Sequence, residues 1–240
     1  MKKLVCLLLL VPGLSFASTG EVKLSKAHYN LYDKASLQRG AHTFVNYCLN
    51  CHSATYMRYN RLQEIGLTEA QIKKNLLFTA EKVGDTMSIA MNKKEAKEWF
   101  GVAPPDLSVV SRSRGADWLY SYMRGFYRDP TTPTGWNNTV YPNVAMPHVL
   151  AHLQGDQVLS TASHTENKAA SDGKLVLEKQ GKLSPAEYEK MVSDLVNFLV
   201  FMGEPAKTKR QQLGIIVLFL LAGLLFLSYL LKKEYWKDVH

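Results

Sequence analysis

Two long apolar segments and a mixed region between them set the layout of the 240-residue chain. The first apolar segment, residues 4–14, follows Lys2 and Lys3 and precedes a small-residue site that ends at Ala17. A basic start, a short apolar run and a small-residue site are typical of a secretory signal peptide, and this apolar run is too short to span a bilayer. The pattern predicts that residues 1–17 are a signal peptide that is removed during export.

The second apolar segment, residues 213–231, contains no charged side chain across 19 residues. At about 1.5 Å per residue, a helix of this length spans about 28 Å, close to the thickness of the hydrocarbon layer. A buried helix of a soluble domain is the alternative, but such helices rarely lack a polar face. Residues 213–231 are therefore predicted to form one transmembrane helix.

Basic residues flank this helix on both sides, so neither side carries an excess of positive charge that would indicate the orientation of the helix. The flanking residues are Lys207, Lys209 and Arg210 before the helix and Lys232, Lys233 and Lys237 after it. The export signal indicates the orientation instead. Residues 18–206 are expected in the bacterial periplasm and residues 232–240 in the cytoplasm, with one pass through the lipid of the inner membrane.

The exported region shows helical spacing at both of its ends. Residues 33–47 place apolar side chains such as Leu37 and Phe44 near one face. Near the other end, Ser184 is followed by Pro185 and by Glu187, which is the pattern of a helix N-cap with proline in the first turn. That second helix is predicted to continue until Gly203 and Pro205 end it.

Weaker signals fill the middle of the chain. Residues 68–98 form a helix-prone polar segment, residues 115–125 a short helix, and residues 126–147 a proline-containing loop region. Strand signals are weak apart from residues 174–177, and the polar stretch 155–183 is interpreted as a surface insertion or hairpin. The predicted fold is mainly α with long loops, plus the C-terminal transmembrane helix.

The sequence Cys48-Leu49-Asn50-Cys51-His52 matches C-x-x-C-H, the attachment signature of a c-type haem. Two thiols at this spacing, on the first turn of a helix, can form thioethers with one porphyrin, and the adjacent imidazole then lies beneath the iron. A zinc site would need two further ligands, and the only other cysteine is Cys6 in the signal peptide. A redox dithiol would not need the histidine. The motif occurs once, so it predicts one covalently bound haem c in a mono-haem cytochrome c-type domain.

The ligand opposite His52 decides what such a haem does, because a thioether there closes the coordination sphere and suits electron transfer. Among the methionines, Met146 lies between Pro142 and Pro147, which restrict the chain and can hold a loop against the haem. His148 and His152 are rival ligands. From the spacing alone, Met146 is the preferred candidate.

The formal net charge of +8 falls to +6 when Lys2 and Lys3 are removed. A basic protein can bind nucleic acid or an anionic membrane. Nucleic acid is not expected here, because the basic residues are scattered apart from the group beside the transmembrane segment and no basic helix is interleaved with aromatic residues.

Further segments make the chain resemble the cytochrome c1 subunit of the cytochrome bc1 complex. They include residues 103–108 (Ala-Pro-Pro-Asp-Leu-Ser), the Asp117-Trp118 pair, residues 145–147 (Ala-Met-Pro), Asp194 to Leu199 and the single C-terminal membrane helix. The resemblance implies that Met146 is the second iron ligand, Arg114 pairs with a haem propionate, Pro105 packs on the ring and Trp118 lies near the haem. Gly40 and Phe44 resemble the residues that pack the first helix of such folds against the last, with Phe198 as the opposing aromatic.

The resemblance also implies a function and partners. The protein would be a subunit without catalytic residues of its own that accepts electrons from the Rieske iron-sulfur protein, assembles with cytochrome b, and reduces a soluble or membrane-bound c-type cytochrome. Family members that dock a basic cytochrome often carry acidic patches, whereas this domain is basic overall. A stand-alone membrane-anchored shuttle and a peroxidase-like haem enzyme with an open distal site are the alternatives.

Overall fold

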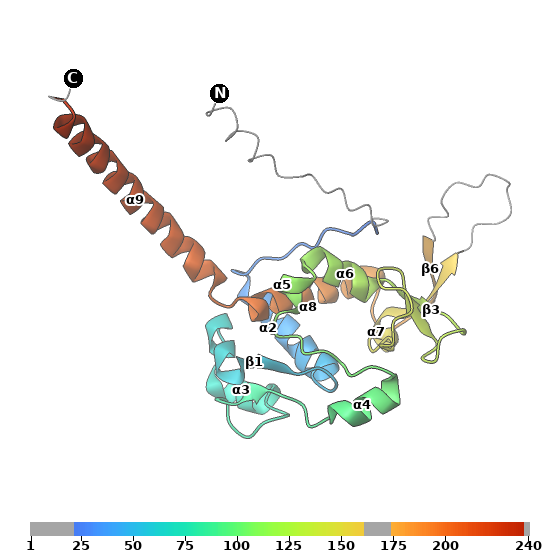
Figure 1. Ribbon diagram of the computed structural model, residues 1–240. Helices are drawn as coiled ribbons and strands as arrows, with labels where there is room; N and C mark the ends of the chain where they lie inside the picture. Colours follow the sequence, from blue (N-terminus) through green and yellow to red (C-terminus); the bar gives the residue numbers. More distant parts are fainter. Residues whose placement is uncertain (1–21, 161–173, 238–240) are drawn as a thin grey trace, which may run out of the picture.

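The computed structural model describes residues 22–160 and 174–237. The predicted signal peptide, residues 1–17, lies outside this part of the chain. The described residues form one mainly helical domain with a single long helix, α9, that extends away from it (Figure 1). The mainly α prediction is confirmed.

Two helices from opposite ends of the domain pack against each other and organise its core. They are α2 (Lys34–Thr43) and α8 (Pro185–Gly203). A Cβ atom at Gly40 would overlap the backbone of Asp194 and lie 2.7 Å from the Cβ of Phe198, so glycine is what allows the two helices to approach. The rings of Phe44 and Phe198 lie 5.6 Å apart. The predicted packing of the first helix on the last is therefore confirmed.

Polar contacts fix the ends and the crossing of this helix pair. Asp33 caps α2 by accepting a hydrogen bond from the Ser36 amide. Ser184 and Glu187 form the predicted capping box at the start of α8. Across the pair, Arg39 holds Asp194 through two hydrogen bonds of 2.6 and 3.0 Å. Because the carboxylate of Asp194 is almost fully buried, this bidentate contact satisfies a charge that would otherwise be costly to bury.

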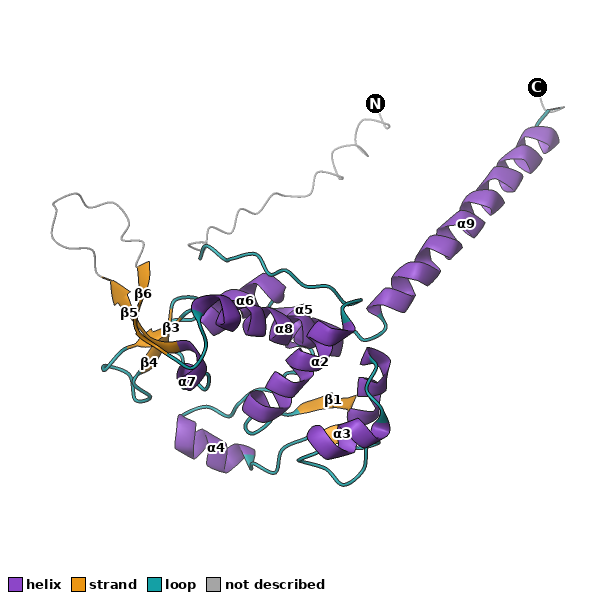
Figure 2. Ribbon diagram, turned by 180° about the vertical axis from the view of Figure 1, so that it is seen from behind, coloured by secondary structure: helices purple, strands orange, loops and turns teal. Residues whose placement is uncertain are grey.

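Shorter elements surround this pair (Figures 1 and 2). The helices are η1 (Phe44–Cys48), η2 (Tyr59–Ile65), α3 (Glu69–Asn75), α4 (Lys93–Phe100), α5 (Val110–Ser113), α6 (Ala116–Arg124) and α7 (Ala151–Gln154). The short helix predicted at 115–125 matches α6. The helix-prone segment 68–98 is only partly helical, because a Gly84-Asp85 turn and strand β2 interrupt it; the Asp85 side chain accepts a hydrogen bond from the Lys82 amide in that turn.

Three antiparallel strand pairs complete the domain. They are β1 (Ala54–Arg58) with β2 (Thr86–Met87), β3 (Phe126–Arg128) with β4 (Trp136–Asn138), and β5 (Gly155–Ser160) with β6 (Lys174–Gln180). The region predicted as loop at 126–147 contains β3 and β4, whose three residues each are too few for a recognisable alternation. The polar stretch 155–183 was interpreted as a surface insertion or a hairpin, and the pairing of β5 with β6 shows a hairpin. Residues 161–173 lie outside the described part.

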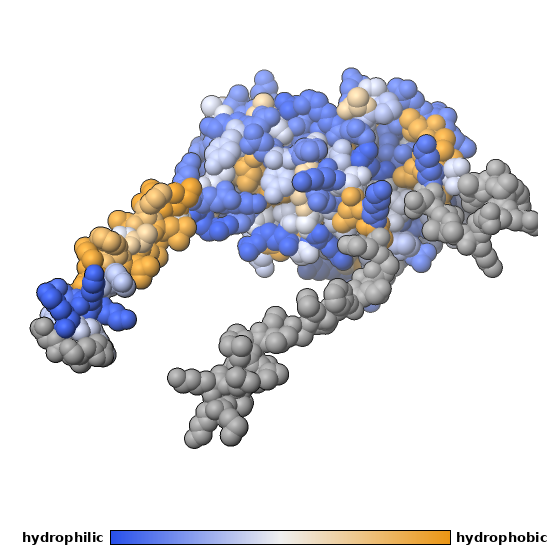
Figure 3. Space-filling model, turned by 90° about the horizontal axis from the view of Figure 1, so that it is seen from above, coloured by the Kyte–Doolittle hydropathy of each residue, from blue (hydrophilic) through white to orange (hydrophobic). Residues whose placement is uncertain are grey.

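Helix α9 runs from Lys207 to Tyr235, which is longer at both ends than the predicted apolar segment. Within the described residues it is the one helix long and apolar enough to cross a membrane. Its apolar side chains are exposed in the isolated chain and stand out against the largely hydrophilic surface of the domain (Figure 3). At its start, the ammonium group of Lys207 lies 5.5 Å from the centre of the Tyr29 ring.

Candidate haem-binding site

The C-x-x-C-H segment lies at the end of a helix. A single π-helical turn, η1, follows α2 directly and ends at Cys48, after which the amides of Cys51 and His52 both bond to the Cys48 carbonyl, at 3.1 and 2.8 Å. The expectation that the two cysteines sit on the first turn of a helix is wrong, because the chain leaves the helix here and enters β1 at Ala54. π-helical turns of this kind occur often at functional sites.

The two thiols differ in how deeply they are buried. Cys48 is 8% exposed, whereas Cys51 is half-buried and lines a pocket. Burial raises the pKa of the Cys48 thiol to about 12, with a smaller contribution from Cys51. Since thiol–disulfide exchange requires a thiolate, this environment disfavours a redox dithiol, the alternative considered for the motif.

The His52 ring is held in one orientation by a backbone carbonyl. Its Nδ1 lies 2.7 Å from the carbonyl oxygen of Pro105, and because that oxygen can only accept, Nδ1 carries the proton. Nε2 is then the unprotonated nitrogen available to a metal. Burial is the largest influence on the pKa of His52 and lowers it, which favours the neutral, ligating form.

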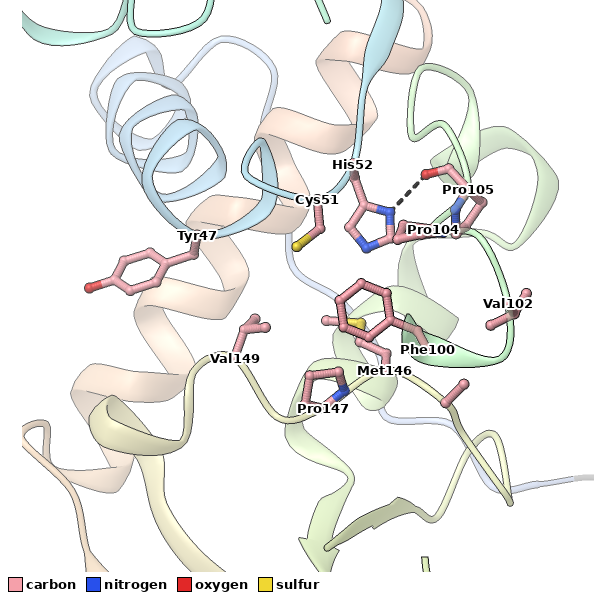
Figure 4. A pocket seen from close by; sticks show the side chains of 11 residues that line it. Tyr47, Cys51, His52, Phe100, Val102, Pro104, Pro105, Met146, Pro147 and Val149 are labelled. Carbon is pink, nitrogen blue, oxygen red and sulfur yellow. Dashed lines mark hydrogen bonds between the residues drawn. The ribbon is translucent and has the colours of Figure 1, made fainter. Parts of the chain in front are cut away.

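His52 and Met146 line the same pocket (Figure 4). The close view shows Cys51 and His52 on one side and Met146 with Pro147 on the other. The pocket has an empty volume of about 550 Å³, part of it open to solvent, and its walls are almost entirely apolar. The lining residues are Tyr47, Cys51, His52, Phe100, Val102, Pro104, Pro105, Ala145, Met146, Pro147 and Val149. An apolar cleft with one imidazole nitrogen and one thioether sulfur as donor atoms fits a haem iron and its ring.

A tyrosine contacts the sulfur of Met146. The hydroxyl of Tyr122 on α6 donates a hydrogen bond to the Met146 Sδ at 3.4 Å. Burial raises the pKa of Tyr122, so this hydroxyl keeps its proton. Tyr122 stacks on Trp118, with centroids 4.8 Å apart and 11° between the planes. Sequence reasoning missed Tyr122, although its i+4 spacing from Trp118 places both on one face of the helix.

Two asparagines hold the loop that carries Met146. The Asn138 Oδ1 accepts from the amides of Val140 and Tyr141, and the Asn137 Oδ1 accepts from the amide of Asn143 at 2.8 Å. Asn143 has φ of 59°, a left-handed conformation that asparagine tolerates better than most residues. Amide side chains therefore anchor the loop in addition to the prolines that the sequence indicated.

Arg114 and Trp118 lie beside this site and do not line the pocket itself. The Arg114 guanidinium is 5.1 Å from the centre of the Trp118 ring and 6.0 Å from that of Tyr141. Within residues 22–160 and 174–237 it has no carboxylate partner. Trp118 stacks on Tyr122, which in turn donates a hydrogen bond to the Met146 sulfur. Their predicted contacts with the haem stay predictions.

The two rival histidines are placed elsewhere. His148 is 5% exposed; its ring stacks on Phe126 at 4.7 Å and meets the edge of Trp136 at 5.0 Å. Neither of its ring nitrogens has a hydrogen-bond partner among the described residues, and burial lowers the pKa of His148 to about 4. His152 places its Nε2 3.3 Å from the hydroxyl of Tyr47. Of the three candidates for the position opposite His52, Met146 is the one that lines the pocket.

Comparisons with known proteins agree with this chemistry. A model described as the Cytochrome C1 family matches residues 24–239. The chain is 52% identical to a protein of Nitrosomonas europaea named ammonia monooxygenase gamma subunit, covering 100% of this chain and 99% of that protein. It is 48% identical to the cytochrome c1 of Allochromatium vinosum, covering 100% of both. A chain of a solved hyperthermophilic respiratory Complex III has 17% identity and a TM-score of 0.41, covering 100% of this chain and 95% of that one, a likeness too low to carry a structural argument.

Proposed function

Because the chain belongs to the cytochrome c1 family, we propose that it is the membrane-anchored electron-transfer subunit of a ubiquinol:cytochrome c oxidoreductase. Family members carry one covalently bound haem c and do not themselves turn over quinol. The observation that carries the proposal is the placement of His52 and Met146 on opposite sides of one apolar pocket beside Cys51.

Residues at the pocket would hold the haem in two ways, by covalent bonds to its ring and by ligation of its iron. Cys48 and Cys51 would form the two thioethers, while His52 through Nε2 and Met146 through its sulfur would ligate the iron. When bound, the haem supplies an iron that gains and loses one electron. If His52 and Met146 both bind the iron, no open site would remain for a substrate, which would suit electron transfer rather than peroxidase chemistry.

Residues at and beside the pocket would control the environment of the iron. The apolar walls would keep most water from the haem ring, and the Pro105 carbonyl accepts a hydrogen bond from Nδ1 of His52. Tyr122 donates to the Met146 sulfur and so holds it in one orientation. Arg114 would pair with a propionate, since its guanidinium has no described carboxylate partner and is held beside the site by Trp118.

Helix α9 would anchor the haem domain to the membrane. The 19 uncharged residues 213–231 span about 28 Å as a helix, enough for one pass through lipid. The export signal predicted for residues 1–17 would place the haem domain in the periplasm of a bacterium and leave residues 232–240 in the cytoplasm.

Partners follow from the family. Cytochrome b and a Rieske iron-sulfur protein would assemble with this subunit, the Rieske protein would supply the electron, and a soluble or membrane-bound c-type cytochrome would receive it. The name of the Nitrosomonas relative assigns that protein to an ammonia monooxygenase. Co-purification from native membranes distinguishes a bc1 complex from that assignment.

The test is purification of the tagged, full-length protein in mild detergent, followed by haem staining of a denaturing gel and identification of the associated subunits. A haem-stained band that co-purifies with a cytochrome b and a Rieske protein, and is reduced on adding quinol, is expected. Absence of covalent haem would refute the cofactor assignment. Isolation as a haem-containing monomer would favour the stand-alone shuttle, and a high-spin ferric spectrum would favour an open distal site.

A further inference from the structure

A set of hydrogen bonds joins residues 52–56 to residues 105–108. Residues 54–56 lie in β1, but these bonds are separate from its pairing with β2. His52 Nδ1 donates to the Pro105 carbonyl at 2.7 Å, and the Leu107 amide donates to the Ser53 carbonyl at 2.8 Å. The Tyr56 amide donates to the Ser108 hydroxyl at 3.0 Å. Hydrogen bonds at three points thus hold residues 52–56 against residues 105–108.

The carboxylate of Asp106 lies among these contacts, and its hydrogen bonds to Thr55 and Ser108 form a clamp between the two segments. Its Oδ2 accepts from both the amide and the hydroxyl of Thr55, each at 2.9 Å. Its Oδ1 accepts from the Ser108 amide at 2.8 Å. Ser108 is 1% exposed, so one end of the clamp is anchored in the interior. Burial alone would raise the pKa of Asp106, but the hydrogen bonds from Ser108 and Thr55 outweigh it and lower that pKa, which keeps the group an acceptor.

We propose that Asp106 is a positioning residue that holds the Pro105 carbonyl on His52 and thereby sets the reduction potential of the haem. The carbonyl of Pro105 lies in the planar peptide unit that it shares with the amide of Asp106, so contacts that hold Asp106 also restrain that carbonyl. A carbonyl that accepts a hydrogen bond from Nδ1 makes the imidazole a stronger electron donor to the iron through Nε2, and a stronger donor favours ferric iron. Loss of the clamp should therefore raise the potential. The inference rests on the proposed role of His52 as an iron ligand.

A simple charge effect must be separated from positioning, because a nearby carboxylate also favours ferric iron by Coulomb attraction. Asp106→Asn removes the charge and one acceptor together. Asp106→Glu keeps the charge but moves the oxygens away from the Thr55 and Ser108 donors. Thr55→Val keeps both the charge and the side-chain shape while removing one donor, and Thr55 is exposed, so the variant should fold.

The experiment is a redox titration of the purified complex, with electron paramagnetic resonance of the oxidised haem as a second readout. Asp106→Asn, Asp106→Glu and Thr55→Val should all raise the midpoint potential and shift the low-spin g values in one direction. Thr55→Ser, which restores the donor, should return both to wild type. The matched control is Asp33→Asn, which removes a carboxylate that caps the far end of α2; it should leave both unchanged.

Several results would overturn the proposal. A raised potential in Asp106→Asn alone, with Asp106→Glu and Thr55→Val like wild type, would mean that only charge matters. Wild-type values in all three would leave Asp106 a structural residue without influence on the haem. If the Asp106 variants do not accumulate with haem, the Thr55→Val and Thr55→Ser pair decides the matter. A wild-type protein without covalent haem would instead refute the proposed function.

Discussion

The hydrogen bond from Tyr122 to the Met146 sulfur should tune the haem, and Tyr122→Phe tests this with one atom removed. The phenylalanine ring can keep the stack on Trp118 at 4.8 Å and the edge contact with Phe126 at 5.1 Å, so the core need not rearrange. What is lost is an O–H dipole whose positive end points at the Met146 sulfur, the proposed iron ligand. Such a dipole disfavours the ferric state, and its removal should lower the midpoint potential.

The size of the shift follows from the strength of the bond. A typical hydrogen bond contributes about 0.5–1.5 kcal/mol, and a thioether is a weak acceptor, so about 0.5–1 kcal/mol applies here. For one electron, a tenfold change in equilibrium is about 59 mV, which corresponds to about 1.4 kcal/mol. Tyr122→Phe should therefore lower the midpoint potential by roughly 20–40 mV. This range is an upper limit, because only the difference in hydrogen-bond strength between the ferric and ferrous states changes the potential.

Redox titration of the purified complex, at one ionic strength, measures the shift. The control is Tyr141→Phe, which removes the hydroxyl of an exposed tyrosine that contacts the edge of Trp118 and does not bond to Met146. Tyr141→Phe should match wild type. If Tyr122→Phe also matches wild type, or raises the potential, then the contact with the sulfur does not act on the iron in the way described.

Three further predictions concern the frame around the site. Gly40→Ala should lower the free energy of unfolding by about 2–3 kcal/mol, because the added Cβ would overlap the backbone of Asp194. Helix propensity returns about 1 kcal/mol, so the midpoint of thermal unfolding should fall by roughly 2–8 °C. Gly84→Ala, with nothing within 4 Å, is the control, and equal midpoints for the two variants at one heating rate would refute the packing argument. His148→Phe should keep the sulfur-to-iron absorption band of the oxidised protein, and loss of the band would restore His148 as a ligand. A chain that ends at Gln212 should carry its haem into the soluble fraction, whereas retention in washed membranes would argue against α9 as the anchor.

The sequence predicted the parts of the fold that depend on local chemistry. The capping pattern from Ser184 to Glu187 predicted where α8 begins, and the uncharged segment 213–231 falls within α9. The interruption of the helix-prone segment 68–98 was not predicted, since it depends on a turn at Gly84 and on pairing of β2 with the distant β1. Pairing between residues far apart in the chain leaves little trace in local composition.

In the site, too, some features could be predicted from the sequence and others could not. His52 was predicted as an iron ligand from the C-x-x-C-H motif, and Met146 from its flanking prolines and the family resemblance; the structure places both in one pocket. The acceptor for the His52 proton is a backbone carbonyl, at Pro105, and a carbonyl is present at every position, so no residue type indicates it. The position of Arg114 on Trp118 was likewise not predicted, because a guanidinium bonds to carboxylates and stacks on aromatic rings equally well.

The central claim, that Met146 closes the iron site opposite His52, is tested most directly by the visible spectrum of the oxidised complex from wild type and Met146→Leu. Leucine keeps the apolar volume of the side chain and removes the sulfur. The wild type should show the sulfur-to-iron charge-transfer band at the red end of the visible spectrum, and Met146→Leu should lose it while keeping covalent haem. A band that survives the substitution, or that is absent from the wild type, would contradict the assignment.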